Sequence, residues 1–336
     1  MGFETDKLKI DMLFSSTLAP RVNGLLDWSD KLYDRHFYTG ASINSGGTQG
    51  LHIAYCPINN YMYMCRRLGR NVAVINCTSN TVVTSINLGT DNYPYGIAYC
   101  PTNNCMYVSI SNGNVKVINC ISNSVVATIG VGSEPEGLAY NPVNNRMYVC
   151  NGYFTNTTVS AINCSTNTVA QTITVGAGPR KIAYCPVNNY MYVCNHRATT
   201  VSVIDCTPVT NTVVENINIG TQYAYAIAYC SINNCMYIGV QASGASVYVV
   251  SCTSNAVIDT LSSIGALEGI VYSQHSNHMY TLDQVGNTIP IDCSTNTIKA
   301  AITIGVTLRG GAYCPVNGLI YMSSYHNNNI YLVGSI

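Results

Sequence analysis

A pair of tyrosines recurs along the sequence with a period of about 43 residues, and this repeat limits the possible folds more than any other feature. In each copy the second tyrosine follows the first by eight residues, across a turn rich in residues that tolerate tight-turn dihedrals. The first tyrosines are Tyr55, Tyr99, Tyr140, Tyr184, Tyr229, Tyr272 and Tyr313. The second tyrosines are Tyr63, Tyr107, Tyr148, Tyr192, Tyr237, Tyr280 and Tyr321. Seven copies of one unit predict a repeat architecture.

Each repeat unit has the pattern of four short strands. The first two strands flank the turn, as at 97–100 and 147–150, and the third alternates valine with other residues, as at 201–206. The fourth is rich in threonine and valine, as at 167–176, and ends at a glycine. Such segments favour strands, and residues 50–336 show no helical period. Because four strands in about 40–45 residues are typical of a propeller blade, the sequence predicts an all-β, seven-bladed β-propeller of four-stranded antiparallel blades.

The end of the repeat region predicts how the ring closes. The seventh unit stops after its third strand, at 330–336, and so lacks an outer strand. We expect the segment 37–44 to supply this strand, because the pairing removes an exposed sheet edge. The predicted organisation is an N-terminal arm, residues 1–35, followed by the propeller, residues 36–336.

The units resemble the YVTN β-propeller repeat family over about residues 50–336. The resemblance rests on Tyr-Val-Cys-Asn at 148–151 and 192–195, on Val-Ser-Val-Ile-Asp at 201–205, and on Val175-Gly176. Cysteine stands where the family leads us to expect serine or threonine. The resemblance implies a propeller of a kind often found on cell or particle surfaces. It implies no single activity, because a fold does not fix function.

Charged residues are few in this chain, and acidic and basic residues are equal in number. Charged residues make up 9% of the chain, fifteen of them basic and fifteen acidic, against roughly 25% in ordinary soluble domains. A chain without net charge has no field that attracts nucleic acid. No apolar run approaches the ~20 residues of a membrane-spanning helix. We therefore expect neither a nucleic-acid partner nor a membrane span.

Several of the scarce charges share one repeat position, four residues before the first tyrosine. In a propeller this position lies where the innermost strand begins, at the rim of the central channel. Glu136 and Arg180 would face each other on neighbouring blades, and so would Glu268 and Arg309, which predicts a ring of salt bridges. The alternative is a polar rim that binds a ligand or glycan, with tyrosines as stacking surfaces. The candidates at the rim are Tyr95, Glu136, Arg180, Tyr225, Glu268 and Arg309, with His52 beside them.

Motifs of catalysis or metal binding are not found. No nucleophile elbow, phosphate-binding loop or dinucleotide fingerprint stands in the required context. No cysteine or histidine cluster has the spacing of metal ligands. We expect no catalytic residue, metal or cofactor. The one basic cluster, Arg66, Arg67 and Arg70, is expected on a surface loop, where it would be solvated or meet a neighbouring molecule.

Sixteen cysteines recur mainly at two repeat positions. Equivalent positions lie one blade apart, farther than the ~5.5 Å Cα separation of a disulfide, so we expect buried free thiols. For two pairs that each span a single hairpin turn, a disulfide is the alternative. These pairs are Cys100 with Cys105 and Cys230 with Cys235. Reduced cysteines and the lack of a recognisable signal peptide predict synthesis in a cytoplasm.

The arm differs in composition from the propeller, since residues 1–36 hold 11 of the 30 charges and the only tryptophan. Residues 6–12 alternate polar and apolar, as in a strand, and Leu25, Trp28 and Leu32 fall on one face of a short helix. The arm either packs on its own propeller or anchors the propeller to a protein in a larger assembly, and we favour anchoring. The expected anchoring residues are Leu8, Ile10, Met12, Phe14, Leu25, Trp28 and Leu32.

The sequence is compatible with three functions. The favoured one is a non-enzymatic structural or interaction protein, displayed on the surface of a large assembly such as a virus particle, where it would decorate the shell or contact a host surface. The second is an exported cell-surface or periplasmic binding protein of the YVTN type. The third is a propeller enzyme of the lactonase or lyase kind, with its site at the channel.

Overall fold

The computed structural model describes residues 36–47, 49–90, 92–152, 155–207, 211–220, 223–241 and 246–335. The chain divides into two units, Met1–Arg35 and His36–Ile336, and the description concerns the second. The predicted anchoring residues Leu8, Ile10, Met12, Phe14, Leu25, Trp28 and Leu32 therefore lie outside the described residues.

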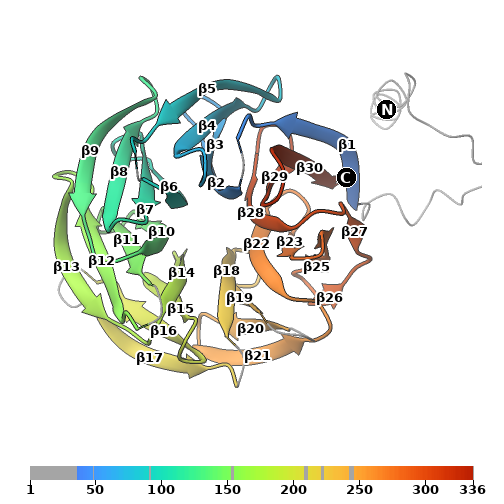
Figure 1. Ribbon diagram of the computed structural model, residues 1–336. Helices are drawn as coiled ribbons and strands as arrows, with labels where there is room; N and C mark the ends of the chain where they lie inside the picture. Colours follow the sequence, from blue (N-terminus) through green and yellow to red (C-terminus); the bar gives the residue numbers. More distant parts are fainter. Residues whose placement is uncertain are drawn as a thin grey trace, which may run out of the picture. The chain divides into compact units, whose positions relative to one another are not determined.

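Seven four-stranded antiparallel sheets are arranged in a ring, with the first strand of each repeat unit nearest the centre (Figure 1). The described residues contain strands and turns and no helix. Blade 1 consists of β2 (Gly50–Cys56), β3 (Tyr61–Arg66), β4 (Asn71–Asn76) and β5 (Thr81–Asn87). Blade 2 consists of β6 (Pro94–Cys100), β7 (Cys105–Ile110), β8 (Asn114–Asn119) and β9 (Ser124–Gly130). Blade 3 consists of β10 (Pro135–Asn141), β11 (Arg146–Asn151), β12 (Thr158–Asn163) and β13 (Thr168–Thr174).

The remaining blades follow the same order. Blade 4 consists of β14 (Pro179–Cys185), β15 (Tyr190–Asn195), β16 (Thr200–Asp205) and β17 (Thr212–Asn218). Blade 5 consists of β18 (Ala224–Cys230), β19 (Cys235–Val240), β20 (Val247–Ser251) and β21 (Ala256–Leu261). The predicted all-β, seven-bladed propeller is confirmed.

Blade 6 departs from the regular pattern. Its sheet consists of β22 (Leu267–Ser273), β23 (His278–Asp283), β25 (Pro290–Asp292) and β26 (Thr297–Ile298). A separate ribbon pairs β24 (Asn287–Thr288) with β27 (Ile302–Thr303). The continuous third and fourth strands expected here are each broken in two. Pro290 explains the break, because proline has no N–H to donate to the ladder.

Blade 7 closes the ring with strands from both ends of the propeller. Its own strands are β28 (Leu308–Tyr313), β29 (Leu319–Ser324) and β30 (Asn329–Ser335), and its outer strand is β1 (His36–Asn44). β1 pairs antiparallel with β30, with Ile43 opposite Ile330 (Figure 1). The predicted closure by the N-terminal segment is confirmed, one residue longer than expected.

The tyrosine repeat forms the core between blades. All seven second tyrosines are fully buried. In blade 1 the hydroxyl of Tyr63 donates to Asn123 Oδ1 of blade 2 at 2.6 Å, and the amide of Asn59 donates to the carbonyl of Cys120 at 2.9 Å. Asn123 ends a turn with φ of 50°, a left-handed conformation that asparagine tolerates. The same bond, from the second tyrosine to an asparagine of the next blade, is found at six joints of the ring.

Candidate functional site: the channel mouth

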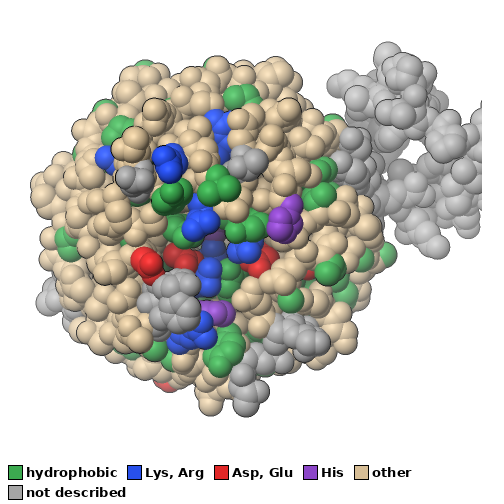
Figure 2. Space-filling view, viewed as in Figure 1, with side chains coloured by type: hydrophobic (Ala, Val, Ile, Leu, Met, Phe, Trp, Pro, Cys, Tyr) green, Lys and Arg blue, Asp and Glu red, His purple; other side chains and the backbone are tan. Residues whose placement is uncertain are grey.

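The predicted rim position is the second residue of each innermost strand. The structure brings its seven occupants around one mouth of the channel, where charged side chains gather (Figure 2). A cavity of about 230 Å³ lies there. Leu51, His52, Arg67, Tyr95, Glu136, Arg180, Lys181, Tyr225, Glu268, Arg309 and Tyr325 line it. A second cavity of about 130 Å³ shares His52, Lys181, Glu268 and Arg309 with the first.

Two ion pairs join neighbouring blades at the mouth. Arg180 Nε lies 2.8 Å from Glu136 Oε2, between β14 and β10, and Arg309 Nη1 lies 2.9 Å from Glu268 Oε2, between β28 and β22. Both carboxylates are buried, and both arginines are partly exposed. Burial raises the pKa of the Glu136 carboxyl, and the guanidinium of Arg180 opposes that rise. The structure thus pairs the charges that the repeat position placed on adjacent blades.

The rim tyrosines contact arginines. The guanidinium of Arg180 lies 4.3 Å from the ring centroid of Tyr225, and Arg309 Nη1 donates to the Tyr225 hydroxyl at 3.3 Å. Arg67 lies 5.3 Å from the ring centroid of Tyr95 and donates from Nε to its hydroxyl at 3.2 Å. Each of these rings therefore already has a cation as a stacking partner.

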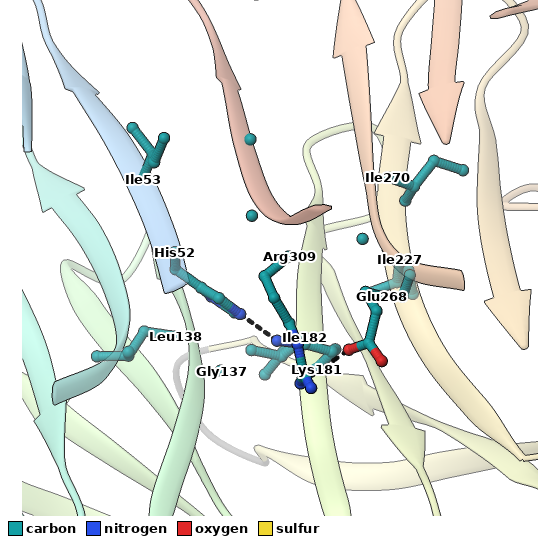
Figure 3. Close-up of a pocket in the computed structure, with 14 residues that line it drawn as sticks. His52, Ile53, Gly137, Leu138, Lys181, Ile182, Ile227, Glu268, Ile270 and Arg309 are labelled. Atoms are coloured by element: carbon teal, nitrogen blue, oxygen red, sulfur yellow. Dashed lines mark hydrogen bonds and ion pairs between the residues drawn. The ribbon is translucent and has the colours of Figure 1, made fainter. Parts of the chain in front are cut away.

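Lys181 lines the channel mouth, and the sequence analysis did not single it out. It comes from β14 and reaches into the channel, where its Nζ contacts Nε2 of His52 on β2 (Figure 3). Burial lowers the pKa of Lys181 to about 8, against the attraction of Glu136, and the charge of Arg180 lowers it further. Burial and the charge of Lys181 hold the pKa of His52 well below its ordinary value, so neutral His52 accepts a hydrogen bond from the ammonium.

The repeat position of Lys181, three residues before the first tyrosine, sets it apart in the sequence, because most residues at this position are small. The occupants of this position are His52, Gly96, Gly137, Lys181, Ala226, Gly269 and Gly310. Small residues are needed because a Cβ on Gly96 would come within 2.0 Å of the Glu136 carbonyl oxygen, and one on Gly310 within 2.2 Å of the Leu51 carbonyl oxygen. The two long side chains at this crowded position meet across the channel.

Of the three clustered arginines that the sequence placed on a surface loop, Arg66 is buried, whereas Arg67 and Arg70 are half-buried. Arg66 is 2% exposed, and its guanidinium donates to Asn71 Oδ1 at 2.6 Å and to the carbonyl of Ser45. Arg67 lines the channel mouth, and Arg70 stacks on Tyr93 with 5.1 Å to the ring centroid. These arginines tie the β3–β4 turn to its neighbours and add one cation to the cavity.

The cavity carries an excess of positive charge. Four basic side chains line it, Arg67, Arg180, Lys181 and Arg309, against two carboxylates, Glu136 and Glu268. Each carboxylate has an arginine partner, and among the residues that the structure describes neither Lys181 nor Arg67 forms an ion pair with an acidic side chain. Such a site suits a ligand that carries a carboxylate or another anionic group.

Sixteen free cysteines lie buried in the structure. Cys100 stands opposite Cys105 across its hairpin, and Cys230 opposite Cys235, but no bond joins either pair. All four of these cysteines are free in the structure. Among the described residues, no group of three or more His, Cys, Asp and Glu side chains is placed to hold a metal ion. In the same part of the chain, no helix has the length and hydropathy of a membrane span.

Comparison with known proteins adds a likeness of fold. No protein-family model matches the chain. No curated protein matches it either. Among solved structures, the chain is similar to hydrazine synthase from Kuenenia stuttgartiensis, with a TM-score of 0.76 and 15% identity over 88% of this chain and 98% of that one. At that identity the likeness shows the propeller fold and carries no activity to this chain.

Proposed function

We propose that the chain is a non-enzymatic binding protein whose channel mouth takes an acidic, hydroxyl-rich ligand such as a glycan with carboxylate groups. The observation that carries this proposal is the cationic excess of the cavity, with Lys181 facing it from β14. A ligand carboxylate would accept charge-assisted hydrogen bonds from Lys181, and a sugar hydroxyl would donate to or accept from the Tyr95 hydroxyl. The YVTN resemblance, which implies surface-exposed propellers, fits a role in binding.

The favoured setting is the surface of a large assembly, such as a virus particle, with residues 1–35 as the anchor. Two features support this. The arm is far richer in charge than the propeller, and the outer strands present uncharged residues such as Thr81, Thr84 and Ser85 to solvent. A propeller that displays a nearly neutral exterior and one charged mouth is suited to selective contact with a polar ligand. The anchor and the ligand site would then occupy separate parts of the chain.

The ligand proposal is tested by titrating the protein with an oligogalacturonate and, as the neutral control, a maltooligosaccharide of the same length. We expect the acidic sugar to bind, with an affinity that falls as salt rises. Lys181→Met should weaken binding by about tenfold or more, because a hydrogen bond to a charged group is worth about 1.5–3 kcal/mol. The matched control is Lys116→Met, since Lys116 lies on β8 and bonds Thr128 at the surface. Equal affinity of the Lys181→Met and Lys116→Met variants would contradict the proposal.

The anchoring proposal is tested by deleting residues 1–30 and measuring how much protein joins the purified assembly. Because the deletion leaves β1 (His36–Asn44) in place, the propeller should remain closed. We expect the truncated protein to fold and to be absent from the assembly. Full occupancy by the truncated protein would show that the arm is not the anchor.

A further inference from the structure

Cysteines from different repeat positions meet at the joints between blades. Cys56 ends β2 of blade 1 and lies in the same buried apolar cluster as Cys120, which follows β8 of blade 2. Five joints have this arrangement. The interblade thiol pairs are Cys56–Cys120, Cys100–Cys164, Cys185–Cys252, Cys230–Cys293 and Cys314–Cys77. Each pair joins the first-strand position of one blade to the third-strand position of the next, so the contact does not lie between equivalent repeat positions.

The surrounding structure holds each pair in place. Both thiols of every pair lie in one buried apolar cluster, as Cys100 and Cys164 do. The amide of Asn103, three residues after Cys100, donates to the carbonyl of Cys164 at 3.0 Å. The same bond runs from Asn188 to Cys252, at 2.8 Å, and from Asn317 to Cys77, at 2.8 Å. These asparagine-to-carbonyl hydrogen bonds therefore fix the hairpin of one blade against the cysteine of the next.

In each pair, the thiol at the end of the first strand has a pKa below its ordinary value. The nearby thiol of Cys120 and the backbone amides of Ile58 and Asn59 lower the pKa of Cys56 to about 7, although burial opposes this. In blade 3 an asparagine replaces the cysteine, and Asn141 Oδ1 accepts the amide of Val143 at 2.8 Å. The backbone amide of this turn thus donates a hydrogen bond to the side chain at the end of the first strand. In the blades that carry a cysteine there, the same amide stabilises the thiolate form.

We propose that the interblade thiol pairs are disulfide-forming sites, which a peroxide converts into five covalent cross-links around the ring. In the first step a Cys56-type thiolate attacks one peroxide oxygen, the O–O bond breaks, and hydroxide leaves with a sulfenic acid formed on sulfur. In the second step the partner thiol attacks that sulfur, expels hydroxide and forms the S–S bond. Two thiols are oxidised, one hydrogen peroxide is reduced, and the two thiol protons and two hydroxides leave as two waters.

The test treats the folded protein with hydrogen peroxide, blocks remaining thiols with N-ethylmaleimide, and maps cross-linked peptides by mass spectrometry without reductant. We expect the mass before blocking to fall by about 10 Da, two hydrogens for each of the five pairs. The five cross-linked peptides should join neighbouring blades. Cross-links within the Cys100–Cys105 or Cys230–Cys235 hairpins, or thiols recovered free or as sulfinic acid without cross-links, would overturn the proposal.

Three variants make the test specific. Cys120→Ser should remove one cross-link. Cys206→Ser is the matched control, because Cys206 has the same repeat position but faces Asn141, so all five cross-links should remain. Asn141→Cys should add a sixth cross-link, between residues 141 and 206. Loss of a cross-link from the Cys206→Ser variant, or no sixth cross-link in the Asn141→Cys variant, would contradict the assigned pairing.

Discussion

At the residue scale, the two repeat tyrosines of blade 4 make different hydrogen bonds. In blade 4 the hydroxyl of Tyr184 donates to Asn189 Oδ1 at 3.1 Å, within its own hairpin. The hydroxyl of Tyr192 donates to Asn255 Oδ1 of blade 5 and accepts from Asn188 Nδ2 at 2.9 Å. Burial raises the pKa of the Tyr192 hydroxyl far above its ordinary value, so it remains a neutral donor at physiological pH. The first tyrosine thus shapes a turn, and the second joins two blades.

These tasks predict unequal losses of stability. Tyr192→Phe should lower the free energy of unfolding by about 1–3 kcal/mol, because Asn255 Oδ1 loses the buried hydroxyl that donates to it. Tyr184→Phe should cost less, since the amide of Asn141 also donates to Asn189 Oδ1, at 2.9 Å. Urea unfolding of both variants measures the difference. A larger loss for Tyr184→Phe would contradict the assigned roles.

At the element scale, the strands were predictable and their irregularities were not. Alternation and turn residues located all seven innermost strands, and the missing last strand of the seventh unit pointed to β1. The sequence did not predict the break in blade 6. The effect of Pro290 depends on which strand pairs with it, and the repeat pattern does not specify that strand. The cysteine contacts escaped for a similar reason. They depend on how far one blade is offset from the next, which periodicity within a blade leaves open.

The closing strand β1 makes a prediction about truncation. Deleting residues 1–44 removes β1 and exposes the edge of β30, whereas deleting residues 1–35 leaves their pairing intact. We expect only the longer deletion to lower the melting temperature, by roughly 5 °C or more, and to promote aggregation through the exposed edge. Thermal unfolding followed by circular dichroism compares the two truncated proteins. Equal melting temperatures would show that β1 does not seal the ring.

At the scale of the whole molecule, the ring concentrates scarce charge where seven strands converge. The sequence predicted this for the position four residues before the first tyrosine, and the structure places its charged occupants in two ion pairs. Lys181 and Arg67 could not be placed in the same way. Lys181 is an exception at a position of small residues, and Arg67 reaches the mouth from a turn outside the innermost strands. The positive charge of the channel mouth could therefore not be predicted from the repeat position alone, because it depends on side chains that only the folded ring brings together.

The protonation of Lys181 tests the proposed acidic-ligand site most directly. Its pKa can be followed by NMR of a ¹³C-labelled lysine side chain, with Lys181→Met to assign the signal. Without ligand we expect titration at about 8, because burial and Arg180 disfavour the ammonium form. A bound carboxylate favours the charged form, so saturation with oligogalacturonate should raise the pKa, and the ligand should bind less tightly as pH rises through that of free Lys181. A Lys181 pKa near its ordinary value in the free protein, or one that the acidic sugar leaves unchanged, would contradict the account.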